Sequence, residues 1–173
     1  MKIGIFGTGT VGRTFATKLS GLGHEVAVGT RDPALTKARN LPGAQASAET
    51  FAQWNEKHPG VRLSTFTEAA RHGEIIIHCT NGQGSLAALA LAGETALGDK
   101  ILMDIANPLD FSKGMPPSLF LCNTDSLGEQ VQKAYPRLRV VKTLNTLNCD
   151  LMVDPARLAG ADHHAFVSGN DTK

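Results

Sequence analysis

The chain has 173 residues, of which 42% are hydrophobic and 19% are charged, and its formal net charge is +1. This balance is typical of a soluble globular domain and excludes a disordered chain. The near-neutral charge gives no support for nucleic-acid binding, and no apolar run approaches the ~20 residues of a membrane-spanning helix. The three scattered cysteines indicate neither a disulfide framework nor a zinc motif, so we expect a reducing cytoplasm.

Strand-like and helix-like segments alternate along the chain, which predicts βαβ units. Strands are predicted over residues 2–6, 25–29, 61–65, 74–80, 100–106, 139–144 and 164–169. Helices are predicted from Val11 to Leu22 and over residues 32–40, 48–58, 84–93 and 126–135, with a loop over residues 107–118. The fold class is therefore α/β, a Rossmann-type, doubly wound and mainly parallel sheet with helices on both faces.

The first predicted strand runs into a G-x-G-x-x-G motif formed by Gly7, Gly9 and Gly12. The motif is specific here because it follows a strand and opens an amphipathic helix. Gly7 permits the tight turn, Gly9 leaves room for a pyrophosphate, and Gly12 lets the helix pack closely on the strand. The N-terminus of that helix would receive the phosphates. Further contacts to the dinucleotide are predicted for Thr8, Thr10 and Val11.

The second predicted strand ends in Thr30 and Arg31 rather than in the carboxylate that binds the ribose of NAD. Thr30 can donate to a phosphate without adding negative charge, and Arg31 can hold a 2′-phosphate through its planar fork of donors. Asp32 precedes Pro33, which favours a helix N-cap over a contact to the ribose. The predicted cofactor is therefore NADP(H).

Polar residues follow three later strands, at the edge of the sheet where ligands bind in doubly wound folds. The predicted contacts to the nicotinamide half of the cofactor are Thr80, Asn81, Ala106, Asn107, Pro108 and Asn145. Each Asn or Thr side chain could instead satisfy its own turn. No catalytic acid or base is predicted, because hydride transfer between two bound rings depends on proximity and alignment.

The histidines do not predict a metal site. His163 and His164 follow Asp162 at the start of a predicted strand, where adjacent side chains point to opposite faces and cannot share one ion. His78 lies among apolar strand residues and is predicted to be a core histidine.

The whole chain resembles the NADP oxidoreductase, coenzyme F420-dependent family, the NADPH-dependent F420 reductases. The resemblance rests on the segments KIGIFGTGTVG, GHEVAVGTRDP, DIANPLDF, NTDSLGEQVQKAYP, RVVKTLNTLNCDLMVDPARL and VSGND. They are also similar to the oxidoreductase domain of the STEAP metalloreductases, which pass hydride from NADPH to a flavin. The resemblance implies hydride transfer between NADP(H) and coenzyme F420 or a related flavin-type acceptor, with F420 as co-substrate. It also implies a homodimer.

The resemblance also bears on the extent of the chain. We expect residues 1–173 to form a single NADP-binding Rossmann domain. The resemblance implies a short helical segment at the C-terminus that helps to shape the acceptor pocket, and we expect this sequence to lack it. Some members have a histidine at the position of Asn145.

Two other functions stay open on the sequence. One is reduction of a small imino or keto substrate, as in the pyrroline-5-carboxylate and ketopantoate reductases, which usually rely on a large helical C-terminal domain. The other is a non-catalytic sensor that binds NADPH and turns over no acceptor. In the leading hypothesis the partner is a small-molecule acceptor, with neither nucleic acid nor membrane involved.

Overall fold

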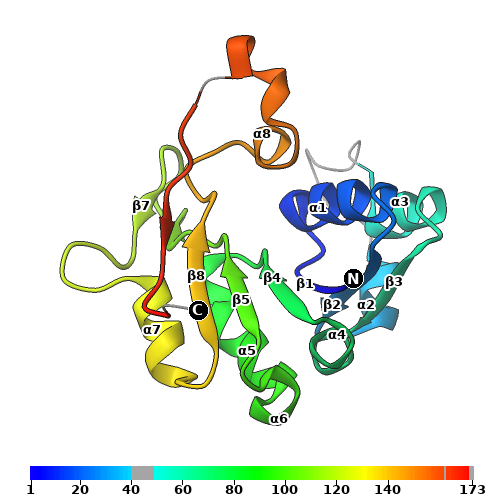
Figure 1. Ribbon diagram of the computed structural model, residues 1–173, viewed down its shortest axis with the longest axis horizontal. Coiled ribbons are helices and arrows are strands. Elements are labelled where there is room, and N and C mark those ends of the chain that lie inside the picture. Colours follow the sequence, from blue (N-terminus) through cyan, green and yellow to red (C-terminus); the bar gives the residue numbers. More distant parts are fainter. Residues whose placement is uncertain (40–48, 162, 172–173) are drawn as a thin grey trace.

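The computed structural model describes residues 1–39, 49–161 and 163–171, and a seven-stranded sheet runs through it (Figure 1). The order is β3-β2-β1-β4-β5-β8-β9, and every pair is parallel except β8 with β9. The strands are β1 (Lys2–Phe6), β2 (Glu25–Thr30), β3 (Val61–Thr65), β4 (Ile75–His78), β5 (Ile101–Asp104), β8 (Arg139–Thr143) and β9 (Val167–Ser168). The order reverses between β1 and β4, which is the switch point where such sheets bind ligands.

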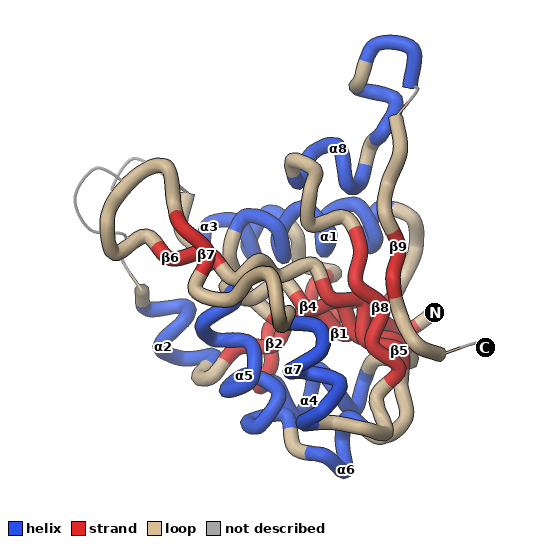
Figure 2. The backbone as a smooth tube through the Cα atoms, turned by 90° about the vertical axis from the view of Figure 1, so that its left-hand side faces the viewer, coloured by secondary structure: helices blue, strands red, loops and turns tan. Residues whose placement is uncertain are grey.

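Helices cover both faces of this sheet (Figure 2). One face carries α1 (Thr10–Gly21), α3 (Phe51–Lys57) and α8 (Cys149–Val153). The other carries α4 (Phe66–His72), α5 (Ser85–Ala92), α6 (Glu94–Leu97) and α7 (Leu127–Ala134), and α2 (Pro33–Ala38) follows β2. None of the helices in the described part of the chain is long and apolar enough to cross a membrane. The predicted α/β fold with helices on both faces is confirmed.

Alternate strand residues feed two separate cores, as the two-residue period of a strand requires. Ile76 packs with Leu89 and Leu102 on the face covered by α4, α5 and α6. Its neighbour Ile77 packs with Ile5 and Phe15 on the face covered by α1. Because both faces are buried, the central strands β1, β2 and β4 are apolar over most of their length rather than alternating.

The structure adds elements that the sequence patterns did not predict. Helix α4 begins directly after β3, because Thr65 is both the last strand residue and the N-cap of the helix. The Thr65 hydroxyl accepts from the Glu68 N–H at 3.2 Å, while a Glu68 carboxylate oxygen accepts from the Thr65 N–H at 2.8 Å. This capping box was legible as T-x-x-E in the sequence. A short antiparallel pair, β6 (Leu109–Asp110) and β7 (Ser118–Leu119), involves the predicted loop 107–118.

Several predicted bounds are corrected. The late strand covers only Val167–Ser168 and is antiparallel to β8, and the helix predicted over residues 32–40 ends at Ala38. Residue 48 of the third predicted helix and Asp162 lie outside the described residues.

Candidate functional site

A cavity of about 750 Å³ opens at the carboxyl ends of β1, β4, β5 and β8. Its volume lies in the range of small-molecule and cofactor sites, roughly 300–1,000 Å³. Predicted site residues from four separate segments meet in its wall: Gly9, Thr10, Val11, Thr80, Asn81, Ala106, Asn107 and Asn145. The fold thus brings together the phosphate loop and the polar strand ends that the sequence suggested separately.

The glycines of the first turn have distinct steric roles. Gly7 has a φ of 116°, and a Cβ there would lie 2.7 Å from the Cys79 carbonyl oxygen. A Cβ on Gly12 would lie 2.2 Å from the Gly7 carbonyl oxygen, so helix α1 can approach the turn only without a side chain there. Both observations match the tight turn and close packing expected of this motif.

The Gly9 position fits a phosphate group. A Cβ built on Gly9 would meet no atom within 4 Å, and the residue lies in the cavity wall. Gly9 is also the N-cap of α1, with no side-chain cap and no acidic residue in the first turn, whereas Thr50 and Thr65 cap α3 and α4. The first N–H groups of α1 therefore lie at the cavity edge with no side-chain acceptor among the described residues, as in helix N-termini that bind phosphates.

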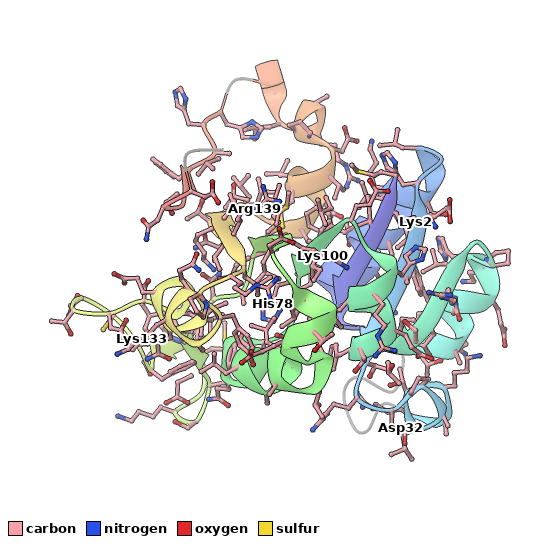
Figure 3. The ribbon with its side chains drawn as sticks, turned by 60° about the horizontal axis from the view of Figure 1, so that its bottom comes forward. Lys2, Asp32, His78, Lys100, Lys133 and Arg139 are labelled. Carbon is pink, nitrogen blue, oxygen red and sulfur yellow. The ribbon has the colours of Figure 1, made fainter. Side chains whose placement is uncertain are left out.

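The end of β2 separates the roles of three adjacent residues. Asp32 is the N-cap of α2, its carboxylate accepting from the Leu35 N–H at 3.0 Å, and Pro33 is the first helical residue. The expected capping role is therefore confirmed, and Asp32 lies at the edge of the molecule in Figure 3. Arg31 is exposed, and within the described residues its guanidinium has no hydrogen-bond or ion-pair partner. It is free to meet an anion.

The Thr30 hydroxyl, which was expected to face a phosphate, has a partner within the protein. The residue is 8% exposed, and its Oγ1 lies 2.8 Å from the Oγ1 of Thr36, which is also buried. This pair joins the end of β2 to helix α2. The contact of Thr30 with a phosphate stays a prediction, because its hydroxyl can accept from Thr36 and still donate. Arg31 is the exposed residue at this strand end.

The loop after β4 is anchored by His78, a core histidine as expected, with no exposed surface (Figure 3). Burial lowers the pKa of His78 to about 4, so the ring is neutral at pH 7. Its Nε2 lies 3.0 Å from the Thr80 hydroxyl, while Nδ1 has no partner among the described residues. An unpaired acceptor costs less than an unpaired N–H, which favours the proton on Nε2. Thr80 then accepts from His78 and keeps its own proton to donate into the cavity.

The asparagine side chains are largely used within the protein. The Asn81 carboxamide oxygen accepts from the Gly84 N–H at 2.8 Å, which is the turn role that the sequence left open. Asn107 donates to the Asn145 carbonyl oxygen at 2.8 Å, and Asn145 Nδ2 donates to Asn107 Oδ1 at 3.0 Å. These two residues therefore join the loops after β5 and β8 at the base of the cavity.

Pro108 and Gly82 lie beside these asparagines, in the loops after β5 and β4. Pro108 lines a neighbouring cavity of about 810 Å³ rather than the one that contains the phosphate loop. We assign the dinucleotide to the smaller cavity, since the glycine turn lies only there. A Cβ on Gly82 would lie 2.2 Å from the Asn107 carbonyl oxygen, so the loops after β4 and β5 touch through this glycine. Sequence reasoning missed Gly82, because its steric partner lies in a distant segment.

The rest of the cavity wall is mostly apolar, with Gln83, Ser112 and Asn148 as its uncharged polar side chains and little charge. Its large apolar side chains, none of them predicted from the sequence, are Ile105, Leu109, Phe111, Leu147 and Met152. Asp110 is its one ionisable acid among the described residues, and a hydrogen bond from the Ser112 N–H lowers the pKa of this carboxyl. No described lysine, arginine or histidine lines the cavity. Burial raises the pKa of the Cys79 thiol in the same wall, which keeps it protonated and a poor nucleophile.

Comparisons with known proteins bear on the family and the fold of the chain. The family model for NADP oxidoreductase, coenzyme F420-dependent, matches residues 2–108. A solved structure from Arthrobacter sp., named as a candidate F420-dependent NADP reductase, is 56% identical with a TM-score of 0.92, covering 99% of this chain and 75% of that one. Metalloreductase STEAP3 of Rattus norvegicus is 28% identical over 147 residues, which cover 85% of this chain. The chain spans only 25% of the length of that relative.

More distant structures share the fold. A reductive aminase from Aspergillus terreus, solved with NADPH and ethyl levulinate, is 18% identical with a TM-score of 0.58. The match covers 87% of this chain and 42% of the aminase.

Proposed function

We propose that this protein transfers hydride between NADP(H) and a deazaflavin or flavin-type acceptor. The premise is that the chain belongs to the NADP oxidoreductase, coenzyme F420-dependent, family and is an NADP-dependent oxidoreductase. One observation carries the proposal. A single cavity contains the phosphate-binding turn, the polar strand ends and an apolar wall, and its described lining has no cation.

The residues that would hold NADP(H) follow from the site. The α1 N-terminus and Gly9 would receive the pyrophosphate, Arg31 the 2′-phosphate, and Thr80 would donate to the nicotinamide half. Bound NADP(H) would supply or accept the hydride. The protein's part is to align the two rings and to exclude water. The apolar side chains of Ile105 and Leu147 in the cavity wall contribute to both tasks.

The charge of the cavity favours a neutral reacting ring over a small acid. A keto or imino acid carries a carboxylate, which needs a cation or an array of free donors when it is desolvated. The described lining has no cation, and its one carboxylate, Asp110, carries a negative charge that would repel such a substrate. A planar ring of the flavin type could pack against Phe111 and Met152.

The proposal is tested by following NADPH absorbance with F420, FMN, FAD, an imino acid and a keto acid. We expect oxidation with F420 or a flavin and none with the two acids. Turnover of an acid would contradict the charge argument. Tight NADPH binding without turnover of any acceptor would support a sensor instead.

We also propose that residues 1–173 form one cofactor-binding domain and, from the cysteine usage, that the protein is cytoplasmic. From the resemblance alone, we propose that it is a homodimer. Light scattering coupled to size exclusion measures the oligomeric state, and a monomer at micromolar concentration would contradict it.

A further inference from the structure

A row of side chains crosses the sheet directly beneath the cavity. His78 on β4 is in register with Asp104 on β5, and Asp104 is in register with Lys142 on β8. Partners in a parallel register lie on the same face, so the three side chains are neighbours. Asp104 has no exposed surface, and the Lys142 side chain is 23% exposed. Neither residue lines the cavity of the phosphate loop.

Asp104 and Lys142 form an ion pair that hydrogen-bonds the backbone of Ala106, a residue of the cavity wall, at both its N–H and its carbonyl oxygen. The Lys142 Nζ lies 3.1 Å from Asp104 Oδ2. The other carboxylate oxygen, Oδ1, accepts from the Ala106 N–H at 3.1 Å, and Lys142 Nζ also donates to the Ala106 carbonyl oxygen. Both peptide groups that flank the Ala106 Cα are therefore held by the same pair.

The backbone that the ion pair holds is part of the cavity wall. Ala106 is 4% exposed and lines the cavity, and the next residue, Asn107, exchanges hydrogen bonds with Asn145. Gly82 touches the Asn107 carbonyl oxygen from the loop after β4. The position of the Ala106–Asn107 peptide thus decides where three loops meet.

Stability alone is a poor reason for such a pair. Removing two charges from water costs as much as their attraction returns, and apolar residues of similar volume are often as stable or more so. Leu102, two positions before Asp104 and therefore on the same face of the sheet, is apolar and fully buried, so this face accepts apolar side chains. The geometry of the pair, directed at one backbone residue, accounts better for its presence.

We propose that Asp104 and Lys142 are positioning residues, which fix the Ala106–Asn107 backbone where the nicotinamide half of NADP(H) binds. The inference rests on the proposed function for the identity of the ligand. It assigns the pair no contact with the cofactor. Its effect reaches the ligand through Ala106 and Asn107.

The test uses the double variant Asp104→Leu/Lys142→Met, which removes both charges and leaves no buried ion unpaired. Lys100→Met is the matched control. Lys100 also donates to a backbone carbonyl, that of Ala70, but it lies just before the amino end of β5. Thermal melting followed by circular dichroism establishes that each variant is folded.

The first readout needs no cofactor. Hydrogen exchange of the peptide that contains Ala106 and Asn107 should accelerate about tenfold or more in the double variant, because the Ala106 N–H loses its acceptor. Exchange there should be unchanged in Lys100→Met. Wild-type exchange rates in the folded double variant would overturn the proposal.

The second readout compares NADPH with 2′-phospho-ADP-ribose, which lacks the nicotinamide. We expect the fragment to bind the double variant as it binds wild type, while the affinity advantage of NADPH over the fragment falls about tenfold. If the double variant lost the same affinity for NADPH and for the fragment, a role confined to the nicotinamide half would be overturned. With an active acceptor, kcat should fall by more than KM changes. Failure of the proposed function would appear separately: the wild-type protein would then oxidise NADPH with none of the acceptors tested.

Discussion

Asn107 and Asn145 hold each other across the base of the cavity, the side chain of each bonded to the other residue, at 2.8 and 3.0 Å. Their carboxamides are therefore committed to joining two loops before any ligand arrives. Two loops joined in this way form a rigid floor, which is what alignment of two rings requires.

Replacing Asn145 by alanine should loosen this floor. We expect Asn145→Ala to lower kcat about tenfold or more, with little change in the affinity for 2′-phospho-ADP-ribose, because the phosphate loop is untouched. Stopped-flow kinetics and fluorescence titration measure the two quantities. Asn55→Ala is the control, since Asn55 also bonds a distant carbonyl, that of Val61, but away from the cavity. Equal kinetic losses in both variants would contradict the role of the pair.

Arg31 should decide between the two nicotinamide cofactors. Arg31→Ala removes an exposed fork of donors, so we expect the Kd for NADPH to rise about 10- to 100-fold, in line with hydrogen bonds to charged groups. The Kd for NADH should stay the same. Arg39→Ala, at an exposed arginine after α2, is the control. Wild-type protein that binds NADH as tightly as NADPH would refute this assignment.

Asp32 should matter for stability and not for the cofactor. Asp32→Ala removes the acceptor of the Leu35 N–H and should cost about 1 kcal/mol of unfolding free energy, the usual loss for an N-cap. Urea unfolding measures this loss, and Ser126→Ala provides a comparable cap on α7. A rise of NADPH Kd in Asp32→Ala alone would place Asp32 at the ribose instead.

His78 should make the protein less stable in acid. Its pKa is about 4 in the folded state and 6.5 as an ordinary histidine, so the unfolded chain binds more protons between these values. The unfolding free energy should therefore be full above pH 6.5 and fall towards pH 4, by at most about 3 kcal/mol from this group. Urea unfolding at pH 7.5 and 5 measures the slope. His78→Gln should flatten it, whereas His72→Gln should not; an unchanged slope in His78→Gln would show that other groups control it.

Gly82 should tolerate no side chain. Gly82→Ala places a Cβ 2.2 Å from the Asn107 carbonyl oxygen, which must move. We expect a loss of about 1–3 kcal/mol in unfolding free energy together with a fall in kcat. Gly21→Ala, where a Cβ meets no atom within 4 Å, should be neutral in both measurements. A stable and fully active Gly82→Ala protein would show that the loops adjust freely.

Features of this protein that depend on nearby residues could be predicted from its sequence. The G-x-G-x-x-G spacing, the apolar strands and the Asp32–Pro33 cap each depend on residues a few positions apart. Propensity and spacing therefore predict them without knowledge of distant contacts. The same reasoning placed Arg31 at the strand end and His78 in the core.

The floor of the site was decided by tertiary structure. Asn107 and Asn145 are 38 positions apart, as are Asp104 and Lys142, and neither pairing is expressed in any local pattern. The contact between the Thr30 and Thr36 hydroxyls forms only when α2 packs against β2, so no strand pattern predicted it. Sequence by itself determined the fold class and the phosphate turn, which local backbone rules govern. Only the folded sheet, by setting the register of β4, β5 and β8, decided which polar groups face a ligand and which hold one another.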